Sequence, residues 1–496
     1  MSAYIKIKSE DSVFILYQET KAGTEFEIDG TIITLQEDIP AGHKAAVKAI
    51  AKGEHVYKFG YSIGIAQQDI APGQWVHTHN LKSGLSGLLS YTYEPQLLEP
   101  PAPADIPTFQ GFLRENGEAG IRNEIWIINT VGCINKTCER LEMLATKRYA
   151  SRGIDGVHHF SHPLGCSQLG DDLSYTQKLL AALANHPNAA GVLVVGLGCE
   201  NNQIGEFKQV IGDLNPKRIK FMAAQEVDNE LERGLELLDE LVDYAETMQR
   251  QPIPVTKLKV GLKCGGSDGF SGITGNPLVG AFSDKLIGYG GTSILTEVPE
   301  MFGAETILMN RAKDEETFDK IVSLVNDFKS YFIRYGQEVY ENPSPGNKSG
   351  GISTLEEKSL GCTQKGGTSN VVDVLPYGER VHATGLNLVQ APGNDQVSVT
   401  ALAAAGAHIV LFTTGRGTPF GGAVPTVKIS TNSDLAERKK HWIDFNAGQL
   451  IDGADKDEVR DALFQYVLDI ASGVKETNNE LYGYREIAIF KDGVTL

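Results

Sequence analysis

The pattern of apolar and polar positions divides the chain into two parts of different texture. Between Tyr4 and Tyr93, short β-rich runs such as Ser12–Tyr17 and Thr31–Leu35 alternate with turns that contain glycine. Runs of this length, separated by such turns, are typical of strands in a small all-β fold. We therefore predict an all-β domain over residues 1–95.

Beyond a proline-rich segment at 96–108, which we interpret as a linker, the texture changes. Apolar runs such as 124–131 and 191–196 alternate with amphipathic stretches such as 226–249. Alternating strands and helices predict parallel, doubly wound α/β layers. A second proline-containing break after residue 249 divides this body into α/β domains at 109–250 and 251–496.

The segment between Tyr340 and Gly367 is rich in Gly, Ser, Pro, Asn and Lys. It is too long for a simple connection between two elements. Long irregular segments in compact domains are often functional, so we expect this one to contribute to a site.

Composition narrows the possible functions. The 496 residues carry a formal net charge of -18, which argues against a nucleic-acid partner because phosphate backbones require a basic face. The apolar runs are too short to cross a bilayer, so no membrane span is expected. The first residues show no signal peptide and the six cysteines are irregularly spread, so we expect a cytoplasmic protein without disulfides.

Five of the six cysteines lie next to a glycine, most of them where an apolar run ends. They are Cys133, Cys166, Cys199, Cys264 and Cys362. Small residues at strand ends leave room for a ligand, and ligands of α/β proteins bind outside the carboxyl ends of the strands. The pattern predicts one pocket assembled from distant loops. We expect the cysteines themselves to pack at the loop roots, with one of them as a candidate metal ligand.

Two histidines follow a Pro-Gly turn in the β domain, within Trp75–Asn80. On a strand, His77 and His79 would point to the same face and could converge on one metal ion. Imidazole suits Fe(II), Mn(II) and Zn(II) alike, so the ion is not determined. Two ligands do not complete a site, and a pair of surface histidines is the alternative.

The loops after the predicted strands carry groups suited to a small polyhydroxy anion. Lysine and arginine pair with carboxylates, and amides bind hydroxyls. The substrate-binding candidates are Ser267, Asn347, Lys348, Asn394 and Arg416. The catalytic candidates are Asp268, Glu297 and Lys365. Dinucleotide and phosphate-loop motifs are absent from the sequence, which disfavours nicotinamide or ATP chemistry.

Seven motifs, in order along nearly the whole chain, resemble those of the altronate/galactarate dehydratase family. They are His77–Asn80, Gly165–Asp172, Gly196–Asn202, Cys264–Gly269, Glu297–Ala304, Asn342–Lys348 and Thr414–Thr418. The resemblance implies an antifreeze-like, β-clip N-terminal domain before a larger α/β body. It also implies dehydration of D-altronate to 2-dehydro-3-deoxy-D-gluconate in hexuronate (galacturonate) breakdown, with Fe(II) or Mn(II) as cofactor.

That reaction removes a weakly acidic proton next to a carboxylate, so it needs a divalent cation and positive side chains. We expect His77 and His79 to hold the metal and the α/β body to supply base and acid. Three alternatives stay open: a catalytically idle sugar-acid binding protein, a dehydratase of a related acid such as galactarate, and an iron–sulfur hydro-lyase that uses the glycine-flanked cysteines. A homo-oligomer also stays open.

Overall fold

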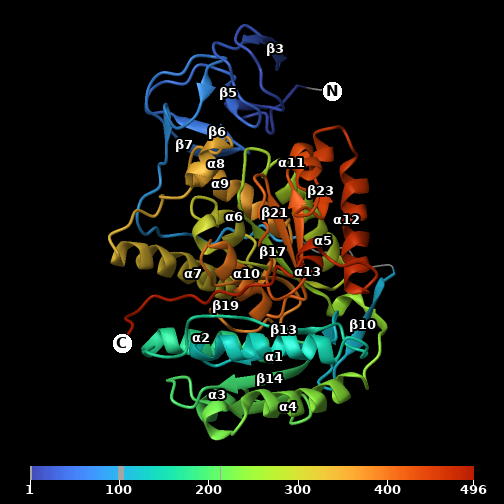
Figure 1. The fold of residues 1–496 in the computed structure, drawn as a ribbon. Coiled ribbons are helices and arrows are strands. Elements are labelled where there is room, and N and C mark those ends of the chain that lie inside the picture. The colour runs from blue at the N-terminus through green and yellow to red at the C-terminus, as the bar shows by residue number, and fades with distance from the viewer. Residues whose placement is uncertain (1–2, 99–104, 213) are drawn as a thin grey trace.

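The computed structural model describes residues 3–98, 105–212 and 214–496. The central part of the predicted linker, residues 99–104, therefore lies outside the described residues. Figure 1 shows three layers: a β module at the top, a large α/β domain in the middle and a smaller α/β domain at the bottom. The predicted fold class, an all-β N-terminal domain with a larger α/β body, is confirmed.

The N-terminal module contains only strands and turns. Its strands are β1 (Tyr4–Ile5), β2 (Val13–Leu16), β3 (Glu25–Ile28), β4 (Thr31–Thr34), β5 (Lys44–Ala46), β6 (His55–Lys58), β7 (Tyr61–Ala66), β8 (Trp75–Val76) and β9 (Leu81–Lys82). They form antiparallel sheets in the orders β1-β2-β5-β8, β3-β4 and β6-β7-β9. Two small apolar clusters, one around Phe14 and one around Val56, form its core.

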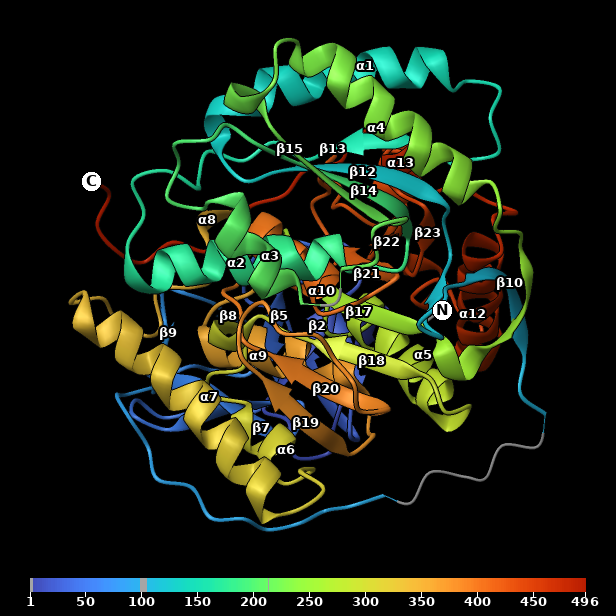
Figure 2. The same cartoon turned by 90° about the horizontal axis from the view of Figure 1, so that it is seen from below.

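The smaller α/β domain has a parallel sheet in the order β13-β12-β14-β15. Its strands are β12 (Glu124–Asn129), β13 (Val157–His159), β14 (Ala189–Gly196) and β15 (Ile219–Ala223). Its helices are η1 (Gly132–Ile134), α1 (Asn135–Arg148), α2 (Gly170–Ala184), α3 (Ile204–Ile211), η2 (Ala224–Glu226) and α4 (Glu230–Ala245). Helices α1 and α4 cover one face of the sheet, and α2 and α3 cover the other (Figure 2).

A short antiparallel ribbon joins the two α/β domains. It consists of β10 (Thr108–Leu113), β11 (Ala119–Gly120) and β16 (Gln251–Pro254), in the order β11-β10-β16. The proline-containing break read from the sequence is therefore a strand. Proline is tolerated there because β16 lies at the edge of the ribbon, where no further strand needs its backbone N–H.

The larger α/β domain is built on a parallel sheet in the order β19-β20-β18-β17-β21-β22-β23. Its strands are β17 (Lys259–Cys264), β18 (Thr292–Leu295), β19 (Val371–Leu375), β20 (Gly385–Val389), β21 (Ile409–Thr414), β22 (Thr426–Ser430) and β23 (Phe445–Asn446). The chain continues from β17 to β18 on one side and later adds β21 on the other side. The carboxyl end of β17 is therefore a topological switch point, where α/β proteins bind ligands.

Helices cover this sheet on both faces (Figure 2). They are η3 (Val255–Lys257), α5 (Gly275–Gly288), η4 (Val298–Glu300), α6 (Glu305–Met309), α7 (Glu315–Arg334), α8 (Pro345–Ser349), α9 (Leu355–Cys362), η5 (Thr363–Gly366), α10 (Asp395–Ala404), α11 (Ser433–Arg438), η6 (Gly448–Leu450), α12 (Lys456–Ala471) and α13 (Asn478–Leu481). Within the described residues, no helix is both long and apolar enough to cross a membrane.

The segment between Tyr340 and Gly367 is not irregular throughout, because it contains α8, α9 and η5. Helix α9 has no solvent-exposed face, because all its residues are buried, the polar ones included. It therefore lacks the separation into an apolar and a polar side that reveals a helix in sequence. Its N-terminus is capped by the Thr354 side chain, which accepts a hydrogen bond from the Glu357 N–H.

Helix α9 also fixes the β module to the body. The Glu357 carboxylate lies between two lysines of the module, with 2.8 Å to both Lys44 Nζ and Lys58 Nζ, and all three side chains are buried. Burial raises the pKa of Glu357, but the two lysines outweigh it and hold that pKa at about 2. Figure 1 shows β6 and β7 directly beside α8 and α9.

Candidate active site

A cavity of about 620 Å³ lies at the carboxyl edge of the larger parallel sheet. The loops after β17, β18 and β20 form one side of it, and the segment from Val339 to Lys358 forms another. The polar residues of its wall include Cys264, Glu300, Asn342, Asn347, Lys358, Asn394 and Asp395. The predicted pocket at strand ends is therefore present, at the switch point of the sheet.

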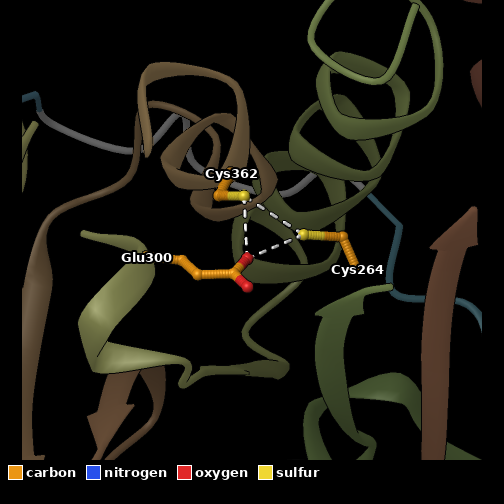
Figure 3. A group of neighbouring side chains, drawn as sticks. All are labelled: Cys264, Glu300 and Cys362. Carbon is orange, nitrogen blue, oxygen red and sulfur yellow. Dashed lines mark hydrogen bonds between the residues drawn. The ribbon is translucent and has the colours of Figure 1, made fainter. Parts of the chain in front are cut away.

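Three buried side chains meet at the edge of this cavity: Cys264 at the end of β17 and Glu300 at the end of η4, which line it, and Cys362 at the end of α9, which lies behind them (Figure 3). The two Sγ atoms are 3.2 Å apart. Glu300 Oε2 lies 3.6 Å from the Cys264 sulfur and 3.1 Å from the Cys362 sulfur. Two thiols and one carboxylate oxygen thus point toward a common centre.

The Glu300 carboxylate uses its two oxygens differently. Oε1 accepts hydrogen bonds from Lys358 Nζ at 2.9 Å and from Asn342 Nδ2 at 3.3 Å. Oε2 faces the sulfur atoms. Burial raises the pKa of Glu300, but the lysines around it, Lys358 foremost, lower that pKa to about 2. The carboxylate is therefore ionised and held in position from behind, as metal-binding carboxylates commonly are.

Next to this group, Glu297 is held between two buried lysines. Its carboxylate accepts hydrogen bonds from Lys263, and from Lys365 at 2.8 Å. Lys365 also lies 2.8 Å from the Cys264 sulfur. Glu297 is a non-glycine residue in the left-handed region, with φ 68° and ψ 52°, a conformation that costs roughly 1–3 kcal/mol and clusters at functional sites.

The charges of the cluster balance without a metal. Lys263, Lys358 and Lys365 face three carboxylates, since Lys263 also lies 3.1 Å from Asp395. A hydrogen bond with Cys264, burial and Glu300 raise the pKa of Cys362 well above its usual value, so this thiol keeps its proton in the absence of a cation. Two thiols lose their two protons when they bind a divalent ion, so metal binding leaves the net charge of the buried site unchanged. The cost of burying the ion is therefore low.

The donor set fits iron better than manganese. Two thiolates and a carboxylate suit Fe(II) or Zn(II), whereas Mn(II) prefers oxygen ligands. Among the described residues, this is the group that brings three such ligand atoms within 4.8 Å of one another.

The structure brings several of the predicted site residues together. Glu297 and Lys365 belong to the buried network, and Asn347 and Asn394 line the cavity. The Asn347 amide donates to the Ser267 carbonyl at 2.8 Å, and its Oδ1 lies 3.3 Å from Lys358 Nζ. Ser267 is buried and its hydroxyl has no partner within the described part of the chain, so it is available to a ligand.

Other predicted residues lie apart from the cavity wall. Asp268 is buried and accepts hydrogen bonds from Ser271, Phe270, Thr431 and Asn432, which suits a structural role. Burial nevertheless raises its pKa. Lys348 is half-buried on α8, and Arg416 is exposed after β21. Their predicted roles stay predictions.

The two histidines do not lie on a strand. Strand β8 ends at Val76, and residues 77–80 form a turn in which the Asn80 N–H donates to the His77 carbonyl. As a result, His77 is buried, with its Nδ1 3.0 Å from Ser353 Oγ, while His79 is exposed. Burial, Lys44 and His43 lower the pKa of His77 to about 3. Neither histidine belongs to the three-ligand group at the cavity.

All six cysteines are free in the structure. Cys264 and Cys362 are buried and their sulfurs are 3.2 Å apart, as packing residues or metal ligands would be. For Cys133, Cys166 and Cys199 the expectation of packed side chains is wrong, because all three are exposed.

Two buried lysines of the site, Lys358 and Lys263, were not predicted from the sequence. Lys358 follows two glutamates and resembles a solvated helix surface, yet it is buried and paired with Glu300. Lys263 could have been noticed, because it interrupts the apolar run of β17 just before a strand end, and a lysine in such a place requires a buried partner. In the sequence, Glu300 stands out only as the second of two acids that follow a predicted strand, Glu297 being the first.

Comparison with known proteins identifies the family of the chain. Three family models match in order: "Altronate/galactarate dehydratase SAF domain" at residues 2–84, "D-galactarate dehydratase/Altronate hydrolase, second domain" at 111–246, and "D-galactarate/Altronate dehydratase, C-terminal" at 255–495. Together they span the β module and both α/β domains.

Curated relatives match over the whole length. The chain is 53% identical to altronate dehydratase of Escherichia coli (strain K12), covering 99% of this chain and 100% of the relative. It is 52% identical to altronate dehydratase of Bacillus subtilis (strain 168), covering all of both chains. Galactarate dehydratase (L-threo-forming) of Escherichia coli (strain K12) is 32% identical, with 98% and 96% covered. The chain therefore belongs to the altronate/galactarate dehydratase family.

Proposed function

We propose that this protein is a hydro-lyase that converts D-altronate to 2-dehydro-3-deoxy-D-gluconate and water in hexuronate (galacturonate) catabolism, with Fe2+ or Mn2+ as cofactor. The observation that carries the proposal is the cavity above Cys264, Glu300 and Cys362, whose wall offers lysine and amide groups. Relatives named altronate dehydratase, at 53% and 52% identity over the full length, support the substrate.

The reaction needs a proton acceptor, a proton donor and stabilisation of negative charge. Removal of the proton next to the substrate carboxylate breaks a C–H bond and builds charge on the carboxylate. The hydroxyl on the next carbon then leaves with a proton as water, and the resulting enol becomes the ketone. The dianionic intermediate is the costly species, so preorganised positive groups matter most.

The chain's own residues divide these tasks. Lys358 lies in the cavity wall and can pair with the substrate carboxylate, while Asn342, Asn347 and Asn394 can bind hydroxyls. Asn394 keeps its Nδ2 for this purpose, because its Oδ1 accepts the Val397 N–H at the start of α10. These contacts would orient the acid over the buried cluster.

The surroundings of Lys365 support a different role from those of the other two catalytic candidates. Burial lowers the pKa of Lys365, but the Cys264 and Glu297 groups outweigh this and raise it well above its usual value. A lysine that holds its proton this tightly cannot remove a proton from the substrate, and its fixed positive charge suits stabilisation of negative charge. Glu297 and Asp268 stay candidates for the base, and a variant of either that retains normal turnover would eliminate it.

Cys264, Glu300 and Cys362 would hold the metal ion, and the ion would supply Lewis acidity toward the carboxylate and neighbouring hydroxyl of the substrate. The rival ligands are His77 and His79. Metal content after loading with Fe2+ or Mn2+ decides between them: loss of the ion in Cys264→Ser but not in a His77→Ala, His79→Ala variant supports the thiol site. The opposite result supports the histidines.

The function is tested by incubating anaerobically purified protein with Fe2+ or Mn2+ and a panel of aldonates and aldarates, and by assaying 2-keto-3-deoxy acids. The expected result is fastest turnover of D-altronate. Faster turnover of galactarate would assign the protein to the second activity of the family. Thermal stabilisation by D-altronate without release of a keto acid would show a binding protein. We also propose a cytoplasmic location, because thiol ligands of iron must stay reduced.

A further inference from the structure

Three glycine-flanked cysteines lie outside the candidate active site, at equivalent places in the smaller α/β domain. Cys133 follows β12, Cys166 follows β13 and Cys199 follows β14. These strands are neighbours in the order β13-β12-β14 and run parallel. Adjacent strands are about 4.8 Å apart, so the three loops that carry these thiols leave one edge of the sheet within roughly 10 Å of sheet width.

Hydrogen bonds tie the three loops to one another. The Gly132 N–H donates to the Leu164 carbonyl at 2.8 Å, and the Asn202 N–H donates to the Gly165 carbonyl at 3.0 Å. The Ser167 N–H donates to the Asn201 side chain at 2.7 Å. Each cysteine therefore lies within a few residues of a hydrogen bond that joins its loop to a neighbouring cysteine loop.

The backbone at Cys166 is shaped for this approach. Gly165 has φ +101°, and a Cβ there would lie 1.9 Å from the Thr130 carbonyl, so glycine is required where the loops cross. Ser167 follows in the left-handed region with φ 58°. Successive N–H groups of such turns form concavities that bind anions, including iron–sulfur clusters.

The exposure of these thiols needs an explanation. Free cysteine is among the most buried residue types, and exposed thiols are liable to oxidation, yet Cys133, Cys166 and Cys199 are all exposed. Two of the sulfurs already have donors nearby, Ser167 Oγ at 3.8 Å from Cys166 and Gln225 Nε2 at 3.5 Å from Cys199. A bound group that covers all three sulfurs would remove the liability.

The three thiols are not gathered as tightly as the ligands of a single ion. Among the described residues, the three ligand atoms found within 4.8 Å of one another are those of Cys264, Glu300 and Cys362, not these thiols. A mononuclear zinc site would need the sulfurs closer and a fourth ligand. A cluster of four irons is wider, and its irons are held by single thiolates.

We propose that Cys133, Cys166 and Cys199 bind a [4Fe–4S] cluster through three thiolates. The cluster is taken up preassembled, so no electrons are transferred: each thiol loses one proton and forms one Fe–S bond in place of a ligand released from the cluster. The fourth iron keeps a position for a ligand from outside these loops.

The C-terminal segment connects this site to the candidate active site. Phe490 lines the active-site cavity, and six residues later the Leu496 N–H donates to the Ser167 carbonyl at 3.0 Å, next to Cys166. Along the way, the Asp492 and Gly493 N–H groups donate to the Asp172 carboxylate. A cluster at the three cysteines would thus be bound next to the end of a segment that forms the cavity wall.

The test is the cofactor content of protein purified under anaerobic conditions from cells that assemble such clusters. The expected result is broad visible absorbance with about four acid-labile sulfides per chain and at least as many irons, since the separate metal site can add one more. Cys133→Ser, Cys166→Ser and Cys199→Ser should each lose most of the sulfide, and Cys138→Ala, which removes a buried thiol of the same domain, should retain it. Circular dichroism confirms that each variant is folded.

Several outcomes would overturn the proposal. Wild-type protein could lack acid-labile sulfide, or it could contain one zinc ion per chain and no cluster. The variant with all three cysteines changed to serine could also retain the sulfide. Sulfide that is lost in folded Cys264→Ser would place the cluster at the other site. Cluster content is measured without substrate, so this test does not depend on the proposed activity. A protein that binds the cluster but does not turn over altronate would still show the absorbance and the sulfide.

Discussion

The two parallel sheets end in similar sequences and build opposite environments. The edge of the larger sheet carries Cys264 with Cys362, both buried among three lysines and three carboxylates. The edge of the smaller sheet carries Cys133, Cys166 and Cys199, all exposed. The same Gly–Cys signal thus marks a closed ionic site in one domain and an open row of thiols in the other. The difference arises from what covers each edge, not from the strand ends themselves.

Helix α9 closes the larger sheet's edge. It supplies Lys358 and Cys362 from one side, and its Glu357 binds two lysines of the β module from the other. The described residues show no comparable ion-paired cover over the three exposed cysteines. Burial makes each ionic pair of the closed site costly to break, while the open site is free to take a ligand.

The closed edge should be most sensitive at Glu300. Glu300→Gln removes the charge that balances Lys358 and one of the three metal donors, so kcat should fall about 10³-fold and metal should be lost. Turnover and metal content measured with D-altronate check this. Glu338→Gln, an exposed acid nearby in sequence, is the control. Normal turnover in Glu300→Gln would place the chemistry elsewhere.

Thiol alkylation compares the two edges directly. In metal-free protein, the three exposed cysteines should react at least about 100-fold faster than the three buried ones, because a buried thiol reacts only after a local opening that costs ~3 kcal/mol or more. Mass spectrometry of peptides after timed alkylation measures each site. Equal rates at Cys199 and Cys264 would contradict the contrast.

The free energy of unfolding should depend on pH through Glu357, which joins α9 to the β module. Its folded pKa of about 2 lies below its ordinary value of 4.5, so its stabilisation is fully present above pH 4.5 and is lost as pH falls toward 2. For the carboxylate alone the shift corresponds to about 3 kcal/mol, and burial, which lowers the pKa of its partner Lys44 to about 8, offsets part of this. Glu357→Gln should lose this stabilisation already at neutral pH and show a flatter acid dependence. Denaturant unfolding from pH 7 to 3.5 measures both proteins, and parallel curves would refute the assignment.

The open edge should give the smallest effect, at Glu200. This buried carboxylate accepts hydrogen bonds from Thr130 and from the Leu197 and Gly198 N–H groups. Burial raises its pKa, but those hydrogen bonds outweigh it, so its stabilisation is present at neutral pH and lost in acid. Glu200→Gln should cost about 1–2 kcal/mol in unfolding free energy. If Glu200→Gln lost as much unfolding free energy as Glu357→Gln, the buried charges at the two edges would contribute equally to stability, and the contrast would be wrong.

Much of the site's location was predictable, and less of its chemistry. Strand ends with glycine placed the pocket, and Glu297, Lys365, Asn347 and Asn394 were found in or beside it. Lys358 and Glu357 were missed because their charges resemble those of an exposed helix until their partners are known. The histidines were misjudged for a local reason, since a turn after Val76 separates their side chains.

The all-β module, the alternating strands and helices of the parallel sheets, and the family could all be predicted from the sequence, because apolar periodicity and ordered motifs are local in the chain. Which polar groups meet could not, because it depends on packing between distant segments. Lys44 and Glu357, or Cys264 and Cys362, are far apart in sequence, and their pairing depends on how α9 packs between the β module and the sheet. Burial, and with it the charge state of each group, follows from that packing.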